Sequence, residues 1–176
     1  NLPGLNFVVP IEVGPEELDA LDAEILSVFP EEKIITPDEV RGTRATLAEA
    51  IERDGWPTLG ETRGRVIFLL DNGGRIKDHY VAGHPSLRGR VLFTSSGPGE
   101  PEAAFLKLND SFGDFDRIQE AVAAGFLVRT RADGDTVEAR ENDTRRRDAA
   151  IASGAQAART ASAEPDGGLG SGYVVQ

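Results

Sequence analysis

Four stretches of the chain have apolar residues that can pack inward on one side of a helix, and in the first of them these residues recur at spacings of three and four. The first covers residues 15–29, with a proline and two glutamates at its start and Pro30 at its end. The other three run from Thr43 or Thr46 to Asp54, from Phe115 to Ala124, and from Asp135 to Ser153. All four need a core on one side, so the chain encodes a globular fold.

Short apolar runs between these helices predict strands. Residues 66–70 are apolar throughout, which is typical of a strand buried on both faces of a parallel sheet. Residues 91–93 and 126–128 repeat this pattern, and residues 155–158 repeat it weakly. Helical and strand patterns therefore alternate along the chain, which favours an α/β fold with parallel strands.

The spacing of the strands indicates a repeated strand–helix unit. Their starts at residues 66, 91, 126 and 155 lie 25, 35 and 29 residues apart, and such a unit needs about 30 residues. The connector over residues 74–88 shows no convincing helical stripe. Either a (β/α)8 TIM barrel or a doubly wound sheet fits this repeat. About four parallel strands are predicted, and a full barrel takes about 250 residues, so we expect the C-terminal half of a TIM barrel.

Composition narrows the possible environments and partners. The chain carries 30 acidic against 19 basic residues, a net charge of −11, which argues against nucleic acid and anionic membrane surfaces. No apolar run is long enough to predict a membrane span. The chain has no cysteine, which excludes disulfides and a cysteine nucleophile. It also lacks methionine, so we expect a piece of a longer protein: a partial barrel over residues 1–160 and a poorly ordered, Gly-rich tail over 161–176.

The candidate chemistry lies where the predicted strands end, since the C-terminal face of a barrel carries function. Arg129, Arg131 and Asp133 follow one another at a spacing of two and therefore project from one face of a strand. Two guanidinium groups on the inner face suit recognition of a phosphate, and Asp133 could hold one of them. An internal Arg–Asp network or a salt bridge at the rim would have the same spacing.

Other strand ends offer weaker candidates. Asp71 could orient a substrate hydroxyl or bind a hard cation, although the following Asn-Gly-Gly also suits a tight turn. Ser95 lies in a run of hydroxyl residues that could donate hydrogen bonds. The two histidines, His79 and His84, fall in the connector rather than at a strand end. No metal-binding motif and no nucleotide-binding glycine motif is present.

Several blocks of sequence, taken together, resemble one protein family. They are Gly55–Gly60, Gly83–Val91, Phe105–Asp110, Gly125–Asp133 and the segments between Glu138 and Ala150. In this order they are similar to the bacterial calcium-dependent phosphatidylinositol-specific phospholipase C-like proteins. These belong to the phospholipase C and glycerophosphodiester phosphodiesterase superfamily of TIM barrels.

The resemblance implies a secreted phosphoric diester hydrolase that acts on a phosphoinositide head group in lipid metabolism. In such a family a histidine pair and Ca²⁺ ligands belong to the first barrel strands. We therefore expect Ca²⁺ in an intact parent, no metal bound to this chain, unknown catalytic residues and no activity of the isolated fragment. The substrate-binding residues that the resemblance supports are Arg129, Arg131, Asp133, Asp71 and Ser95.

Two alternatives remain open at this point. Ala161 stands where the family has a strand-end aspartate, which favours a non-catalytic pseudoenzyme or a phosphate-binding remnant. The other alternative is an unrelated doubly wound α/β domain that binds a sugar phosphate. Such a domain would have an open sheet with a crevice where the strand order reverses.

Overall fold

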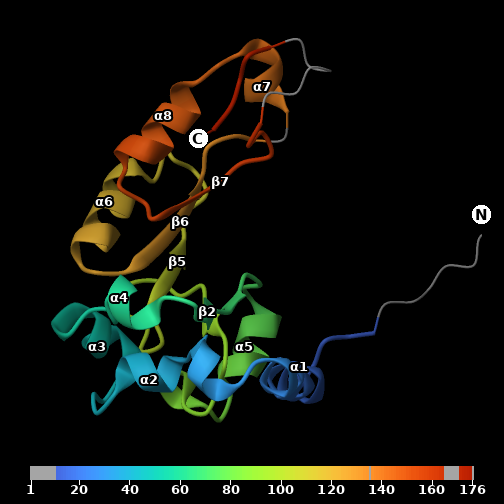
Figure 1. The fold of residues 1–176 in the computed structure, drawn as a ribbon, viewed down its shortest axis with the longest axis vertical. Coiled ribbons are helices and arrows are strands. Elements are labelled where there is room, and N and C mark those ends of the chain that lie inside the picture. The colour runs from blue at the N-terminus through green and yellow to red at the C-terminus, as the bar shows by residue number, and fades with distance from the viewer. Residues whose placement is uncertain (1–10, 135, 165–170, 176) are drawn as a thin grey trace, which may run out of the picture.

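The computed structural model describes residues 11–134, 136–164 and 171–175, which form an elongated α/β molecule with short strands along its middle (Figure 1). The helices are α1 (Pro15–Val28), α2 (Pro37–Arg41), α3 (Leu47–Arg53), α4 (Leu59–Thr62), α5 (Arg75–Val81), α6 (Phe115–Ala123), α7 (Val137–Glu141) and α8 (Arg145–Ala152). The 3₁₀ turns are η1 (Glu31–Lys33) and η2 (Pro85–Leu87). The strands are β1 (Ile34–Ile35), β2 (Val66–Ile67), β3 (Leu69–Leu70), β4 (Phe93–Thr94), β5 (Phe105–Lys107), β6 (Leu127–Arg131) and β7 (Ala157–Arg159).

All strand pairs are parallel, and neighbours in the chain are neighbours in space. β1 pairs with β2, β3 with β4, β5 with β6, and β6 with β7. A bridge between Ser95 and Phe105 links the end of β4 to β5, and β2 and β3 are two parts of one stretch interrupted at Phe68. This sequential order is that of a barrel wall, and the described strands show no reversal of the kind a doubly wound sheet requires.

The strand count differs from the prediction of about four. β1 has two residues and β5 has three, which is too short for a two-residue period to stand out in a sequence. With both included, the wall has six strand positions, counting β2 and β3 as one. The barrel-type α/β fold class predicted from the sequence is confirmed, with more strands than expected.

The stretch over residues 66–70 is also less buried than predicted. Val66 and Leu69 are each 37% exposed, whereas Leu70 is 7% exposed. In a closed barrel, strands on the far side would cover the inner residues, and among the described residues no strand lies opposite. One face of the wall is therefore open.

The N-terminal part of the described chain, drawn in the lower half of Figure 1, is held together by helices that the sequence predicts well. α1 begins at Pro15, and Glu17 caps it by accepting from the Gly14 amide at 2.9 Å. α3 begins after Thr46, whose hydroxyl accepts from the amide of Glu49 at 3.1 Å. The buried face of α3 is the predicted one, Leu47, Ala50 and Ile51.

The predicted connector over residues 74–88 contains a helix, α5, that the sequence pattern does not reveal. Its buried face depends mainly on Tyr80, which is fully buried, with Ile76 and Val81 partly buried. One large residue over two turns gives little periodicity. α5 packs on α1, so it still acts as the crossover helix between β3 and β4.

A second correction concerns the single helix predicted over residues 135–153. The structure has α7 and α8 instead, separated by Asn142 in the left-handed conformation at φ 53°. Asn tolerates that conformation better than most residues, so the helical pattern breaks there. Asp135, the first residue of the predicted helix, lies outside the described residues.

The turn η2 carries two consecutive left-handed residues that are not glycine, Ser86 (φ 56°) and Leu87 (φ 58°). The Ser86 hydroxyl accepts from the amide of Leu47 at 2.5 Å and donates to the carbonyl of Pro101 at 2.8 Å. The guanidinium of Arg41 donates to the Ser86 carbonyl at 3.2 Å. This turn, buried beneath three other segments, joins α2, α3 and the β4–β5 connection.

The predicted tail, residues 161–176, is described in part. Tyr173 is 2% exposed and donates its hydroxyl to the carbonyl of Ala132 at 3.0 Å, and the amide of Val175 donates to the carbonyl of Ser162. These contacts attach residues 171–175 to the end of β6, while the domain boundary at residue 160 stays a prediction. No helix in the described ranges has the length and apolarity for crossing a bilayer.

Candidate functional site

The two faces of β6 differ sharply in chemistry. Val128, Thr130 and Ala132 are fully buried on the side where α6 and α8 pack against the strand. Arg129 and Arg131 alternate with them and are partly exposed, so they lie on the opposite, inner face. The predicted shared face of the two arginines is confirmed by this burial pattern.

Arg129 belongs to a cluster that gathers from three neighbouring strand ends. Its Nη1 lies 3.5 Å from Oδ1 of Asp71, which follows β3, and donates to Oδ1 of Asn109 at 3.2 Å. Lys107 at the end of β5 places its Nζ 3.0 Å from the same Asp71 oxygen. Lys107 and Arg129 are register partners in the β5–β6 pair, which brings both cations to one face.

Ser95 adds a fourth strand end to this cluster. Its hydroxyl accepts from the backbone amide of Lys107 at 3.2 Å. That contact directs one lone pair of the oxygen toward β5 and leaves the hydroxyl hydrogen available as a donor. The structure thus brings together Asp71, Ser95 and Arg129, three residues that the sequence singled out separately.

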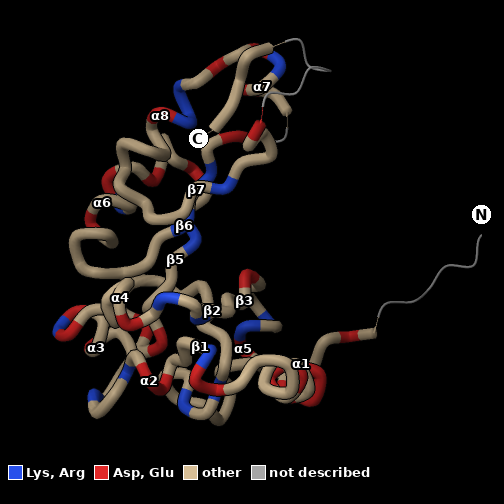
Figure 2. Tube along the Cα trace, viewed as in Figure 1, with Lys and Arg blue, Asp and Glu red and all other residues tan. Residues whose placement is uncertain are grey.

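Arg131 lies one pleat further along β6, toward the end of the strand. It is the register partner of Arg159 on β7, so two more cations share the inner face. The Nε of Arg131 is buried without a hydrogen-bond partner in the described part of the chain, and Arg159 is exposed. Figure 2 shows these basic positions along β6 and β7, in contrast to the acidic positions on α1.

Asp133 does not hold either arginine in place, as the sequence suggested it could. Its carboxylate is 6% exposed, accepts from the Thr160 hydroxyl at 2.5 Å and accepts from the Ala161 amide at 3.2 Å. Since β6 ends at Arg131, the alternation of faces does not continue to residue 133. Asp133 therefore fastens the end of β7 to the end of β6, and the nearby Ala161 contributes its backbone rather than a side chain.

The two histidines lie away from the cluster. His79 is near the end of α5, and Nδ1 of His84 donates to the Arg88 carbonyl at 2.8 Å. Both lie in the segment that connects the end of β3 to the start of β4. The placement of His79 and His84 in the connector is confirmed, and the acid–base chemistry of an imidazole pair is not available at the cluster.

The cluster does not suit a calcium ion. Ca²⁺ takes six to eight oxygen ligands, several of them carboxylates, and Asp71 is the carboxylate that the cluster offers. Asp71 is already shared by Lys107 and Arg129, whose charges would repel a divalent cation. Across residues 11–134, 136–164 and 171–175, no three His, Cys, Asp or Glu side chains are grouped as a metal site requires.

No pattern in the sequence singles out Lys107 or Asn109 as a site residue. Strand β5 is too short to be recognised, so nothing placed residue 107 at a strand end. Both residues do fall in the block Phe105–Asp110 that carried the family resemblance. The family resemblance of that block indicates that the segment is important, but it assigns no role to Lys107 or Asn109.

Comparison with known proteins gives one match. The family model described as phosphoinositide phospholipase C, Ca²⁺-dependent, matches residues 4–176 of the chain. No curated protein and no solved structure matches it. The matched range includes every strand end that contributes to the cluster of Asp71, Ser95, Lys107, Asn109 and Arg129.

Proposed function

Since the chain belongs to the Ca²⁺-dependent phosphoinositide phospholipase C family, we propose that it binds the phosphorylated head group of a phosphoinositide. The site is the inner face of the barrel wall. The observation that carries the proposal is the convergence of Lys107 and Arg129 on one carboxylate at neighbouring strand ends. Two cations held by one anion can exchange that anion for a phosphate.

The exchange follows from the geometry of the cluster. Arg129 presents a planar guanidinium that can donate two hydrogen bonds to phosphate oxygens, and Lys107 adds a point charge. The hydroxyl of Ser95 donates to a third oxygen, and Asn109 keeps the Arg129 side chain in place through its Oδ1. Arg131 lies next along the strand and adds a further donor, while Asp133 supports the strand ends without contacting the ligand.

We propose that this chain alone binds but does not cleave the phosphodiester. Cleavage needs a general base and a general acid near the phosphate, and His79 and His84 both lie off the inner face. The acid–base groups of the reaction then come from residues outside this chain. Ca²⁺, when it is bound in a family member, stabilises charge on the phosphate, and the cluster of this chain supplies no ligand set for it.

The family resemblance also leads us to propose that the protein acts outside the cytoplasm. The alternative proposal, a pseudoenzyme that retains anion binding, uses the same cluster. It is favoured by the pairing of Asp71 with two cations, because a carboxylate in that state is not a metal ligand. The two proposals differ only in whether other residues restore turnover.

Calorimetry with myo-inositol 1-phosphate tests the binding site. We expect saturable binding that Arg129→Ala weakens about tenfold or more, because a charge-assisted hydrogen bond contributes about 1.5–3 kcal/mol. Arg53→Ala, which removes an equal charge from the exposed end of α3, is the matched control and leaves binding unchanged. Equal affinity of the two variants would refute the site.

We expect Asp71→Asn to change the affinity for inositol phosphate in the opposite direction to Arg129→Ala in the same experiment. The substitution removes the anion that competes with phosphate for Lys107 and Arg129, while the Asp71 carbonyl and Asn109 still position the two side chains. We therefore expect inositol phosphate to bind severalfold more tightly than to the wild type. Asp116→Asn on α6 removes one negative charge at an exposed position and controls for net charge. Weaker binding by Asp71→Asn would show that Asp71 contacts the ligand instead of competing with it.

An activity assay tests the absence of turnover. With a fluorescent inositol phosphodiester and added Ca²⁺, we expect the isolated chain to release no product above background. Binding without turnover agrees with the proposal, and turnover abolished by Arg129→Ala would overturn it in favour of a self-sufficient enzyme.

A further inference from the structure

The outer side of β5 lacks the helix that a parallel connection normally provides. Residues 96–104 join β4 to β5, and they include Gly97-Pro98-Gly99-Glu100-Pro101. Two prolines and two glycines within five residues prevent a helix there. No helix of this connection lies on the outward-facing side of β5, although Leu106 on that side is only 3% exposed because neighbouring segments pack against it.

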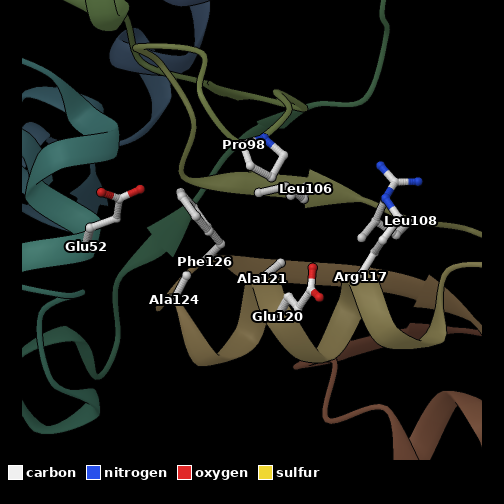
Figure 3. Close-up of a pocket in the computed structure, with 9 residues that line it drawn as sticks. All are labelled: Glu52, Pro98, Leu106, Leu108, Arg117, Glu120, Ala121, Ala124 and Phe126. Carbon is white, nitrogen blue, oxygen red and sulfur yellow. The ribbon is translucent and has the colours of Figure 1, made fainter.

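A pocket of about 260 Å³ lies on this side of β5, between α3 and α6 (Figure 3). Its walls are apolar where they meet the sheet, with Leu106 of β5, Ala121 of α6 and Phe126 before β6. Leu106 faces outward because its neighbour Lys107 faces the inner cluster. The pocket is therefore separated from the phosphate-binding cluster by the sheet itself.

Acidic side chains outnumber basic ones at the mouth of the pocket. Glu52 of α3 and Glu120 of α6 both line it, and Figure 3 shows them on opposite sides of the Phe126 ring. Neither carboxylate has a salt-bridge partner within the described ranges. The one cation of the lining, Arg117, forms an ion pair with Asp114 at 2.6 Å.

We propose that this pocket binds a small organic cation, an alkyl- or arylammonium. Its apolar group would pack against Pro98, Leu108 and the edge of Phe126, and its ammonium would pair with the carboxylate of Glu52 or with that of Glu120. An aromatic ring attracts a cation over its face, particularly where water is excluded. The volume is slightly below the 300–1,000 Å³ of drug-sized sites, which limits the ligand to a small molecule of about the size of n-hexylammonium.

Charge selects this occupant over others of similar size. An anionic amphiphile would meet two carboxylates and a net charge of −11, and a neutral one would gain only the apolar contacts. The proposal is independent of the proposed function, because none of its residues belongs to the phosphate-binding cluster. If no ammonium binds this pocket, the proposal of inositol phosphate binding is unaffected. If inositol phosphate does not bind, the proposal for this pocket is likewise unaffected.

The test compares three probes of equal chain length: n-hexylammonium, n-hexanol and n-hexanoate, each titrated into the full chain by NMR or calorimetry. We expect saturable binding of n-hexylammonium, weaker binding of the alcohol and none of the carboxylate. Glu52→Gln and Glu120→Gln each weaken n-hexylammonium binding about two- to fivefold, since exposed ion pairs contribute about 0.2–1 kcal/mol. The double variant weakens it about tenfold.

Glu24→Gln on the exposed face of α1 is the matched control, because it removes one negative charge far along the chain from the pocket. Both glutamates of the pocket lie at exposed positions, so their variants keep the fold, which circular dichroism verifies. Equal binding of the alcohol and the ammonium would overturn the proposal and leave a purely apolar pocket. No saturable binding, or no difference between the double variant and Glu24→Gln, would also overturn it.

Discussion

Asp22 is the most unusual single residue of the lower part of the molecule, a carboxylate that is 8% exposed. It accepts from the hydroxyl of Tyr80 at 2.6 Å and lies 3.2 Å from Nη1 of Arg90. The guanidinium of Arg90 also stacks over the Tyr80 ring, 4.3 Å from its centroid. Burial raises the pKa of Asp22, and the hydrogen bonds from Tyr80 and Arg90 offset only part of that rise.

This raised pKa predicts how stability changes with pH. The native state holds a proton on Asp22 more tightly than the unfolded chain does, so protonation stabilises the wild type as the pH falls. We expect the free energy of unfolding of the wild type to rise relative to Asp22→Asn between neutral pH and about pH 4. Urea unfolding at several pH values measures this difference.

Asp116→Asn serves as the control, because it makes the same substitution at an exposed position on α6. A wild type that loses stability relative to Asp22→Asn on acidification would mean that the ion pair with Arg90 outweighs the burial of the carboxylate.

At the scale of residues, the alternation of side chains between the two faces of a strand predicts site residues only within the strand itself. Arg129 and Arg131 lie on the inner face because β6 includes both. Asp133 follows the end of β6 and turns to Thr160, which no spacing rule indicates. Lys107 was missed because its position depends on pairing with β6, a contact between residues 22 apart in the chain (107 to 129).

The junction of α3 and α6 is the element-scale contact that shapes the outer pocket. Gly125 ends α6 with φ +93°, and a Cβ at this position would lie 3.1 Å from the carbonyl oxygen of Ile51. Both the backbone conformation and the close approach of α3 therefore require glycine. This glycine sets how near the two helices can come to each other.

Gly125→Ala tests that requirement. We expect a loss of about 1–3 kcal/mol in the free energy of unfolding, because the left-handed conformation and the contact with Ile51 are both strained by a methyl group. Gly73→Ala is the control, since nothing lies within 4 Å of its Cβ position and its φ is not positive. Thermal or urea unfolding compares the two, and equal losses would contradict the role of Gly125.

Elements were predictable where their own residues carry the signal. α1, α3 and α6 have several apolar residues at helical spacing and recognisable ends, and all three were predicted close to their observed bounds. α5 depends on Tyr80, whose burial arises from α1 and Arg90 rather than from neighbours in the chain. β1 and β5 are defined by their pairing with β2 and β6, so the sequence of either alone contains too little pattern.

For the whole molecule, the parallel wall predicts an uneven distribution of stability. β6 is paired on both sides and packed beneath α6 and α8, whereas β7 is an edge strand with all three residues exposed. Local opening requires little energy where few buried contacts are lost. We expect backbone amides of β6 to exchange with deuterium more slowly than those of β7.

Hydrogen exchange followed by NMR or mass spectrometry measures this order. Comparable protection of β6 and β7 would indicate that a further strand covers the edge of β7 in solution. The barrel-type order itself was predictable from the repeat of strands and helices, but the open inner face was not, because exposure depends on what lies opposite rather than on local sequence.

The turn around Ser86 has a consequence for the kinetics of folding. Its partners Arg41, Leu47 and Pro101 lie 45, 39 and 15 residues away in the chain, so loops of those lengths must close before the turn is complete. Two left-handed residues cost energy until those hydrogen bonds form. Contacts of long sequence separation slow folding, and this turn thus belongs to the steps that finish the native state rather than to those that begin it.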